Sequence, residues 1–301
     1  MKTDIRTLDL NLLKTLDALL DERSVTRAAA RLSLTQPAVS GMLTRLRDNF
    51  DDPLFIRAPH GMVPTLRAQQ LAPTVKKILS DINALLQPTE FDPRTAELTF
   101  TLAATDYALK AVVVPFIAAL KVQAPGIRVR VVPVEPERLG SQFEQGKIDL
   151  ALLTPNTTPG DLHSRTLYEE RYVCMLRAEH PDAQRPLTLD RFCSLEHILV
   201  SYEGESFWGV TDDALAKVGR KRRIGLSVSS FLVLPEMLAV SEMMAVVPSR
   251  MARSPALICV QQPPVEIQGF TKSMAWHERS HRDAAQQWLR ELLHETSQRE
   301  A

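Results

Sequence analysis

Apolar residues near the amino end recur at the spacing of an α-helix. Leucines follow one another at three- and four-residue steps between Leu12 and Leu20, which predicts a helix over about residues 10–21 with one buried face. Ser24 is a candidate N-cap for a second helix that ends near Leu32, because its hydroxyl can accept the free N–H groups of the first turn. Thr35 caps a third helix in the same way. The buried stripe of that third helix consists of Val39, Leu43, Leu46 and Phe50.

The opposite face of the third helix is polar. Gln36, Ser40 and Thr44 are spaced four residues apart, and Arg45 and Arg47 flank them as cations that could reach phosphates. Taken alone, such residues could form an ordinary solvated helix face. The short turn before the helix instead favours a helix-turn-helix, in which the second helix of the pair enters the major groove and reads base edges. We therefore expect this face to contact DNA.

A β-prone segment follows the three helices. Residues 52–57 and 62–64 read as two strands joined by a turn at residues 59–61, which together predict a β-hairpin wing. Arg57 in the first strand is placed to meet a phosphate or the minor groove. The whole chain has 36 cationic and 36 acidic side chains, so its formal net charge is +0. Between Arg23 and Arg67, however, seven cations face three acids, and this local excess suits a nucleic-acid partner.

The segment after the wing carries a coiled-coil pattern. Thr65 is a candidate N-cap, and apolar residues recur at three- and four-residue steps on the way to Pro88. The apolar seam consists of Leu71, Val75, Ile78, Ile82 and Leu85. Such a helix could pack on its own domain, but its position between two domains favours a dimerising linker. Pro73 lacks a backbone N–H, so we expect a kink or a new helix start near it.

The rest of the chain alternates strand-like and helix-like segments. Strands near residues 98–104, 127–132 and 148–153 enclose helices at 107–123 and 137–145, an order that predicts a largely parallel sheet. Further strands are expected near residues 172–177, 197–200, 224–228, 244–247 and 270–276. Further helices are expected near residues 211–218, 232–240 and 283–295. These elements suffice for two α/β lobes.

Ligands of open α/β sheets bind beyond the carboxyl ends of the strands. The polar and aromatic residues at those ends are therefore the candidates for an effector site: Thr105, Asp106, Thr154, Ser201, Tyr202, Ser229, Ser230 and Phe231. Hydroxyls and helix N-termini suit a ligand that bears a carboxylate, and Phe231, Phe207 or Trp208 could stack on an aromatic ring. Capping a strand end or filling the core is the alternative role for each of these side chains.

Several longer motifs resemble one family. A likeness to the winged helix-turn-helix of LysR-type transcriptional regulators runs through residues 9–13 (DLNLL), 24–32 (SVTRAAARL), 35–40 (TQPAVS) and 52–57 (DPLFIR). Residues 100–106 (FTLAATD) and 186–193 (PLTLDRFC) resemble the effector domain of the same family, so the likeness covers essentially the whole chain. It is closest to the branch that includes the nodulation regulators and the salicylate-responsive regulators of aromatic catabolism.

The resemblance implies a domain plan of mixed α+β and α/β character. It implies an N-terminal winged helix-turn-helix DNA-binding domain over 1–65, a dimerising linker helix over 66–90 and an effector-binding domain over 91–301. The effector domain would be built from two α/β lobes like a periplasmic binding protein. Lobe I would comprise about 91–163 and 268–301, and lobe II about 164–267.

The resemblance also implies specific contacts with DNA. Family contacts fall on Gln36, Pro37, Ser40 and Arg57. Together with Thr35, Thr44 and Arg45, these residues make up the expected DNA-binding set. Gly41 stands where many members have an arginine, which leaves one family contact without its side chain and lowers the local helix propensity.

One string suggests a different chemistry. Residues 277–281 read His-Glu-Arg-Ser-His and match H-E-x-x-H, the zinc-protease signature, which requires both histidines on one helical face. The string directly follows a strand, and Ser280 resembles a cap for the next helix, so we expect His277 and His281 to straddle a turn. A zinc metalloprotease is therefore kept only as the alternative function. We expect no bound metal and no cofactor.

The three cysteines give no support to a metal or disulfide framework. Cys174, Cys193 and Cys259 form no CxxC pair, and we expect them to be reduced and buried. The sequence also contains no G-x-G-x-x-G, no G-x-x-x-x-G-K-[ST] and no G-x-S-x-G, so nucleotide-dependent and serine-hydrolase chemistry find no support.

These patterns favour a DNA-binding regulator rather than an enzyme. The longest apolar run, residues 111–120, contains Pro115 and is too short to span a membrane, and the amino end lacks the apolar core of a secretory signal. We therefore expect a cytoplasmic protein that does not engage a membrane. The expected partners are double-stranded promoter or operator DNA, a small-molecule effector, further copies in a homodimer or homotetramer, and RNA polymerase. Effector binding would act by shifting the population of effector-domain arrangements.

Overall fold

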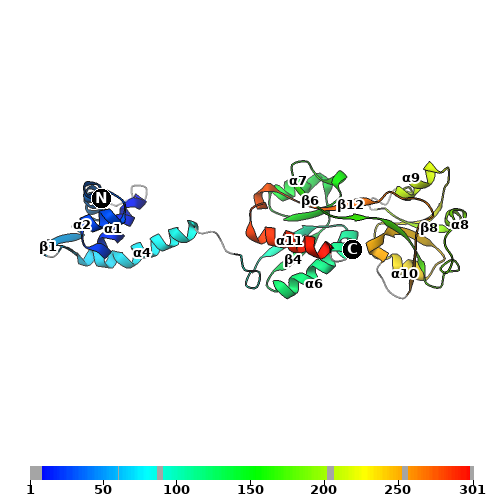
Figure 1. Ribbon diagram of the computed structural model, residues 1–301, viewed down its shortest axis with the longest axis horizontal. Coiled ribbons are helices and arrows are strands. Elements are labelled where there is room, and N and C mark those ends of the chain that lie inside the picture. Colours follow the sequence, from blue (N-terminus) through cyan, green and yellow to red (C-terminus); the bar gives the residue numbers. More distant parts are fainter. Residues whose placement is uncertain (1–8, 60, 87–90, 202–206, 253–256, 299–301) are drawn as a thin grey trace. The chain divides into compact units, whose positions relative to one another are not determined.

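The chain folds as two compact units, residues 1–89 and 90–301. Their structure is a computed structural model that describes residues 9–59, 61–86, 91–201, 207–252 and 257–298. Figure 1 shows the helices and strands of both units. Each unit has a hydrophobic core of its own. No helix within the described residues is long and apolar enough to cross a membrane.

The first unit contains three short helices, a hairpin and a longer helix. These elements are α1 (Leu10–Glu22), α2 (Val25–Arg31), α3 (Gln36–Phe50), β1 (Phe55–Ala58), β2 (Gly61–Pro64) and α4 (Leu66–Leu86). The predicted helices and the antiparallel wing are confirmed. The predicted N-caps are confirmed too, because the hydroxyls of Ser24, Thr35 and Thr65 each accept the N–H of the residue three positions on.

The core of the first unit lies between α1 and α3. Leu12, Leu16 and Leu19 of α1 are fully buried and belong to one cluster with Val39 and Leu46 of α3. The apolar stripes predicted for the two helices are thus both buried in this core. Each such side chain stabilises the fold by roughly 1.5–3 kcal/mol relative to an exposed one.

Helix α4 continues through Pro73 without a break. The new helix start expected near this proline is therefore not found. Ala68 and Val75, on either side of it, are buried in the core of the first unit, and Leu71 packs against that core. This packing supports the helix where one backbone hydrogen bond is missing. Farther along the predicted seam the side chain of Leu85 is 83% exposed, so only the first half of the seam is used within the unit.

Lobe I of the second unit is built on a five-stranded sheet with the order β4-β3-β5-β12-β6. Its strands are β3 (Thr99–Ala103), β4 (Arg128–Val132), β5 (Leu150–Leu153), β6 (His163–Glu170) and β12 (Phe270–Trp276). β3 pairs in parallel with β4 and β5, whereas β12 runs antiparallel to β5 and β6.

Lobe II is built on a second five-stranded sheet with the order β11-β7-β10-β8-β9. Its strands are β7 (Tyr172–Arg177), β8 (Glu196–Val200), β9 (Arg223–Val228), β10 (Met244–Pro248) and β11 (Ile258–Gln261). β8 pairs in parallel with β9 and β10, whereas β7 runs antiparallel to β10 and β11. The expected parallel pairing of the strands near residues 98–104, 127–132 and 148–153 is confirmed. One strand of each sheet runs against the others, and it is the strand with which the chain enters that lobe, β12 in lobe I and β7 in lobe II.

Helices pack on both sheets. α5 (Asp106–Ala108), a π-helical turn (Leu109–Val113) and α6 (Val114–Gln123) succeed one another where a single helix was expected, and α11 (Ala284–Gln298) packs beside α6. The shorter helices are α7 (Leu139–Glu144), α8 (Leu189–Ser194), α9 (Val210–Lys217) and α10 (Leu234–Ala239). Of all these elements, the sequence did not predict α8, β6 and β11. β6 is mostly polar, which hides its strand character.

The chain passes between the two sheets twice. It leaves the first sheet after Glu170, at the end of β6, and it returns with Phe270, at the start of β12. The first passage was expected at about residue 164, but residues 163–170 pair with β12 and so belong to lobe I. In Figure 1 these two strands are the long ones that lead toward the second sheet.

Candidate nucleic-acid interface and effector site

Helix α3 has two chemically different faces. Val39, Leu43 and Leu46 are buried in the core. The exposed residues of its first half are Gln36, Pro37, Ser40, Gly41, Thr44 and Arg45, and Thr35 is exposed directly before them. The helix starts at Gln36 because the Thr35 hydroxyl caps it and Pro37 is preorganised for the first turn. Its first two turns therefore present polar side chains to the solvent.

Two residues of the expected DNA-binding set have partners within the unit. The Thr44 hydroxyl donates to the carbonyl oxygen of Ser40 at 3.2 Å, which is a bond along the helix itself. The Arg45 guanidinium lies 3.7 Å from the carboxylate of Asp9, the N-cap of α1. Gln36 and Ser40 form no side-chain hydrogen bond with the part of the chain that the structure describes, so their side chains are the ones available to a partner.

Arg47 fastens the wing to α3. Its guanidinium donates to the carbonyl oxygens of Pro53 at 2.8 Å and Phe55 at 3.1 Å. Both carbonyls lie at the entrance to β1, so part of the guanidinium is bound within the unit, and a contact of Arg47 with a phosphate stays a prediction. Gly61 at the other end of the hairpin has a φ of +128°, and a Cβ atom there would lie 2.8 Å from the Arg23 carbonyl oxygen. The Met62 N–H donates to that same Arg23 carbonyl oxygen at 3.0 Å, so the wing is held at both ends.

Arg57 lies on the exposed surface of the wing. Its backbone pairs with Met62 across the hairpin, and its side chain forms no hydrogen bond or ion pair with any described residue. A cation held on a strand without an internal partner can bind a phosphate at little cost. The neighbouring apolar side chain of Ile56 is also exposed.

Acids of α1 compensate several cations elsewhere in the unit. Arg31 lies 2.8 Å from Asp21, and the Lys76 ammonium lies 2.8 Å from the same carboxylate. Hydrogen bonds from Lys76 and Arg31 lower the pKa of Asp21. Arg27 pairs with Glu22 at 3.3 Å. The cationic excess counted along the sequence is therefore smaller in three dimensions than the count suggests.

Two of the expected effector residues meet between the lobes. Asp106 starts α5 in lobe I, after the cap residue Thr105, and Phe231 follows β9 in lobe II. The Phe231 N–H donates to Asp106 Oδ2 at 2.6 Å, and the Phe231 ring lies 6.3 Å from the ring of Tyr107. The structure thus brings together residues that stand 125 positions apart in the sequence.

The other expected effector residues are placed less directly. The Ser201 N–H donates to the Val228 carbonyl oxygen at 2.8 Å, so Ser201 lies beside the strand that ends before Ser229 and Ser230. Ser230 caps locally by accepting the N–H of Leu232. Thr154 at the end of β5 is bonded within its own turn, 3.1 Å from the Thr157 hydroxyl. Tyr202 lies outside the described residues.

Phe207 and Trp208 were candidates for stacking on an aromatic effector. They are exposed and line a cavity of about 290 Å³ in lobe II, together with Asp212, Leu215, Ile224 and the basic residues 220–222. The Trp208 indole N–H donates to Asp213 at 2.8 Å. Asp106 and Phe231 are not among the residues that line this cavity.

Lys272 carries a buried ammonium group, and the sequence analysis did not predict it as a site residue. Its side chain on β12 is only 3% exposed, and Nζ donates to the Leu152 carbonyl oxygen at 2.9 Å near the end of β5. Nζ also lies 5.8 Å from the centre of the Tyr107 ring. Burial lowers the pKa of Lys272 to about 7. A lysine inside a segment predicted as a buried strand was the signal in the sequence that could have drawn attention to it.

Glu170 connects the lobes at the first passage of the chain. Its carboxylate accepts the Tyr107 hydroxyl of lobe I at 2.6 Å, and the backbone N–H and hydroxyl of Ser249 in lobe II at 3.1 and 2.6 Å. Burial raises the pKa of the Tyr107 hydroxyl, which therefore stays protonated as a donor. Tyr107 thus joins Lys272, Phe231 and Glu170 in one buried neighbourhood.

The metalloprotease string does not form a helical pair of ligands. His277 caps a single 3-10 turn (Glu278–Ser280), where its Nδ1 accepts the Arg279 N–H at 3.2 Å. His277 and His281 straddle this turn, as expected. The cysteines are free; Cys174 is buried as expected, whereas Cys193 and Cys259 are only partly buried.

Comparisons with known proteins place the chain in one family. The LysR substrate binding domain matches residues 94–298, and the bacterial regulatory helix-turn-helix of the lysR family matches residues 10–69. The transcriptional activator NahR of Pseudomonas putida is 38% identical over 96% of this chain and 98% of its own length. Nodulation protein D 2 of Rhizobium tropici is 32% identical over 95% of this chain and 92% of its own length.

A solved structure supports the same conclusion. A transcriptional regulator from Pseudomonas aeruginosa is 31% identical, covers 96% of this chain and 97% of its own, and has a TM-score of 0.59. The expected fold and the expected branch of relatives are confirmed, and nothing supports the metalloprotease alternative. With its helix-turn-helix unit for DNA and its two-lobed unit for a small-molecule effector, the chain belongs to the LysR family of transcriptional regulators.

Proposed function

We propose that α3 reads operator DNA through Gln36 and Ser40 while Arg57 holds the sugar-phosphate backbone. The observation that carries this proposal is the two-sided character of α3, whose apolar face is buried while its first turns present unpaired polar side chains. Gln can form bidentate hydrogen bonds with adenine in the major groove. Thr35, Pro37, Thr44 and Arg45 form the rest of the DNA-facing set, although the internal bonds of Thr44 and Arg45 make them weaker contributors.

The test is a binding profile of the Gln36→Ala variant. The full-length protein is titrated on its own upstream DNA and on duplexes that carry every single base change in each half-site. We expect Gln36→Ala to relax the preference at one base step per half-site, because one donor and acceptor pair is lost. A profile identical to that of the wild type would show that Gln36 does not read a base. Gln142→Ala, the same truncation in the second unit, is the control.

The effector is proposed to bind between the lobes around Tyr107, whose ring lies 6.3 Å from the Phe231 ring and 5.8 Å from Lys272 Nζ, beside Asp106. Lys272 supports an effector that carries a carboxylate. A buried ammonium with a single hydrogen-bond acceptor is unfavourable, and a bound anion would compensate its charge. Thr105 and the hydroxyls of Ser201, Ser229 and Ser230 would add hydrogen-bond donors, while the rings of Tyr107 and Phe231 favour an aromatic body.

A matched pair of ligands tests this effector class. Benzoate and benzamide share one shape and differ in charge, and their affinities for the full-length wild type and for Lys272→Met are compared by calorimetry. We expect the wild type to prefer benzoate and the variant to lose that preference. Failure of both ligands to bind the wild type would contradict the proposed class, and equal preference in both proteins would exclude Lys272 from the site.

Control of transcription is proposed to follow from assembly. The exposed half of the α4 seam supports a homodimer, which would present two copies of α3 to a two-part operator, and effector domains would extend it to a tetramer. An effector that favours one arrangement of the lobes would shift the population of assemblies and so alter the DNA bend that RNA polymerase meets. In this role the protein works in the cytoplasm and catalyses no reaction.

A further inference from the structure

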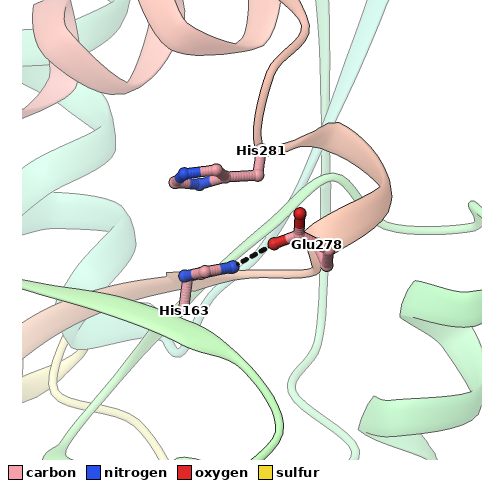
Figure 2. A group of neighbouring side chains, drawn as sticks. All are labelled: His163, Glu278 and His281. Carbon is pink, nitrogen blue, oxygen red and sulfur yellow. Dashed lines mark hydrogen bonds and ion pairs between the residues drawn. The ribbon is translucent and has the colours of Figure 1, made fainter.

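A cluster outside both proposed sites brings two histidines and one glutamate together. His163 is the first residue of β6, and Glu278 and His281 come from the turn that follows β12. Figure 2 shows the His163 ring pointing toward the Glu278 carboxylate, with the ring of His281 stacked above it. His163 Nε2 lies 2.5 Å from Glu278 Oε2, and the two imidazole centres are 4.2 Å apart at an angle of 15°.

The cluster draws on only part of the H-E-x-x-H string. Its third member, His163, stands 115 residues before Glu278 in the sequence. His277, which the string would require, is instead bonded to the Arg279 N–H as the cap of the turn. One ligand atom from each of His163, Glu278 and His281 lies within 4.8 Å of those of the other two.

Chemistry and exposure suit a transition-metal ion at this place. We propose that His163, Glu278 and His281 bind a divalent transition-metal ion such as Zn²⁺ or Ni²⁺. Two imidazole nitrogens and one carboxylate oxygen are the donors these ions prefer, and water would complete the coordination. The side chains of His163 and Glu278 are 39% and 62% exposed, so an ion can reach them from the solvent. Mg²⁺ and Ca²⁺ prefer oxygen donors alone.

Binding requires a local rearrangement. The Trp276 indole N–H donates to His281 Nδ1 at 3.1 Å, and the stacked imidazole rings do not both point at one centre. The ion would replace the proton shared by His163 and Glu278, while the His281 ring turns out of its stack and exchanges its bond with Trp276 for a metal bond. We therefore expect a site that forms on binding rather than a rigid preformed cage.

The ion would link two separate parts of lobe I. His163 begins β6, whereas Glu278 and His281 lie between β12 and α11. These elements are neighbours in the sheet, and a shared ion would resist their separation. A group that binds only the folded state stabilises it. Metal uptake should thus raise the melting temperature of the full-length protein.

Calorimetry on the tag-free, chelator-treated full-length protein tests the site with Zn²⁺, Ni²⁺ and Mg²⁺. We expect one Zn²⁺ or Ni²⁺ per chain and no uptake of Mg²⁺. His163→Ala and His281→Ala should lose this site, together with the metal-dependent rise in melting temperature. His277→Asn is the matched control, because the asparagine side chain can still accept the Arg279 N–H and cap the turn while the variant removes a histidine outside the cluster. It should bind as the wild type does.

Three results would overturn the proposal. These are a wild type that takes up neither ion, a His163→Ala variant that binds like the wild type, and a His277→Asn variant that loses the ion as His163→Ala does. If an alanine variant fails to fold, Glu278→Gln replaces it, since the amide keeps the size of the side chain but removes the anionic ligand. Its melting temperature without metal reports the fold, and its binding must be weaker than that of the wild type.

Discussion

At the scale of single residues, Arg47 and Arg57 show how two arginines close in sequence take different roles. Arg47 is bonded to two carbonyl oxygens of its own chain, whereas Arg57 stands ten positions later on the exposed side of the hairpin. Charge counting treats the two alike, because it carries no information on which carbonyl groups the fold leaves unpaired. The position of the wing determines that Arg47 is bonded within the fold, whereas Arg57 is available to DNA.

Arg57→Ala should weaken binding to every duplex sequence. The guanidinium is proposed to contact a phosphate, so its loss removes about one counterion-release event and reduces the slope of log K against log salt by about one. Fluorescence anisotropy at several salt concentrations measures this slope. Arg94→Ala, the same substitution in the second unit, should leave it unchanged. An effect confined to one operator variant would instead assign Arg57 to base recognition.

Lys272 predicts a specific pH dependence of stability. Its pKa in the folded protein, about 7, lies below the ordinary value of 10.5, so between these values the unfolded chain binds more protons than the folded one. The contribution to the free energy of unfolding therefore rises with pH through this window, by up to about 1.4 kcal/mol per pH unit. Chemical unfolding at pH 7 and pH 9 should show the wild type gaining stability relative to Lys272→Met. A constant difference between the two would contradict this.

At the scale of secondary-structure elements, caps and periodicity predicted most of the fold. Thr35 and Pro37 predicted the start of α3, and the three- and four-residue spacing of the leucines predicted α1, because these signals are local in the chain. β6 escaped prediction because polar residues dominate it and its strand form depends on pairing with β12 from far along the sequence. Antiparallel pairing at one side of each sheet was missed for the same reason, since direction is fixed by distant segments.

Two glycines of the first unit should respond in opposite ways to alanine. Gly61 has a φ of +128° and a carbonyl oxygen 2.8 Å from where its Cβ would lie, so Gly61→Ala should be destabilising. Gly41 lies within α3 with nothing within 4 Å of a Cβ, so Gly41→Ala should stabilise the protein by about 0.5–1 kcal/mol. Thermal unfolding of the two variants measures both effects. A Gly61→Ala variant as stable as the wild type would refute the assignment of strain to Gly61, and a destabilised Gly41→Ala variant would contradict the prediction for Gly41.

At the scale of the whole molecule, the site residues could be listed from the sequence but not assembled. The strand-end rule selected Asp106 and Phe231, and the structure joins them by a hydrogen bond of 2.6 Å. The same rule could not find Lys272, which lies inside β12, or Glu170, which ends β6, a strand that the sequence did not predict. The metal cluster was likewise hidden, because His163 has no sequence relation to the string it joins.

The exposed half of α4 predicts that Leu85→Glu disrupts self-association. Leu85 is 83% exposed and continues a seam whose first half is buried within its own unit, so a second chain is the expected cover. Sedimentation velocity should show smaller particles for Leu85→Glu, together with weaker binding to a two-half-site operator. Ser80→Glu adds the same charge at an exposed position of α4 outside the seam, and it should sediment as the wild type does. An unchanged sedimentation coefficient for Leu85→Glu would exclude this seam from the interface.

The bonds from Arg47 to the entrance of β1 have a consequence for promoter choice. They fix the hairpin to α3, so the distance between the two proposed DNA contacts, in α3 and in the hairpin, cannot adjust to the target. A promoter whose grooves do not match that distance must itself be distorted, and its local stiffness then enters the energy of recognition. The protein would thus discriminate among base pairs that it never touches.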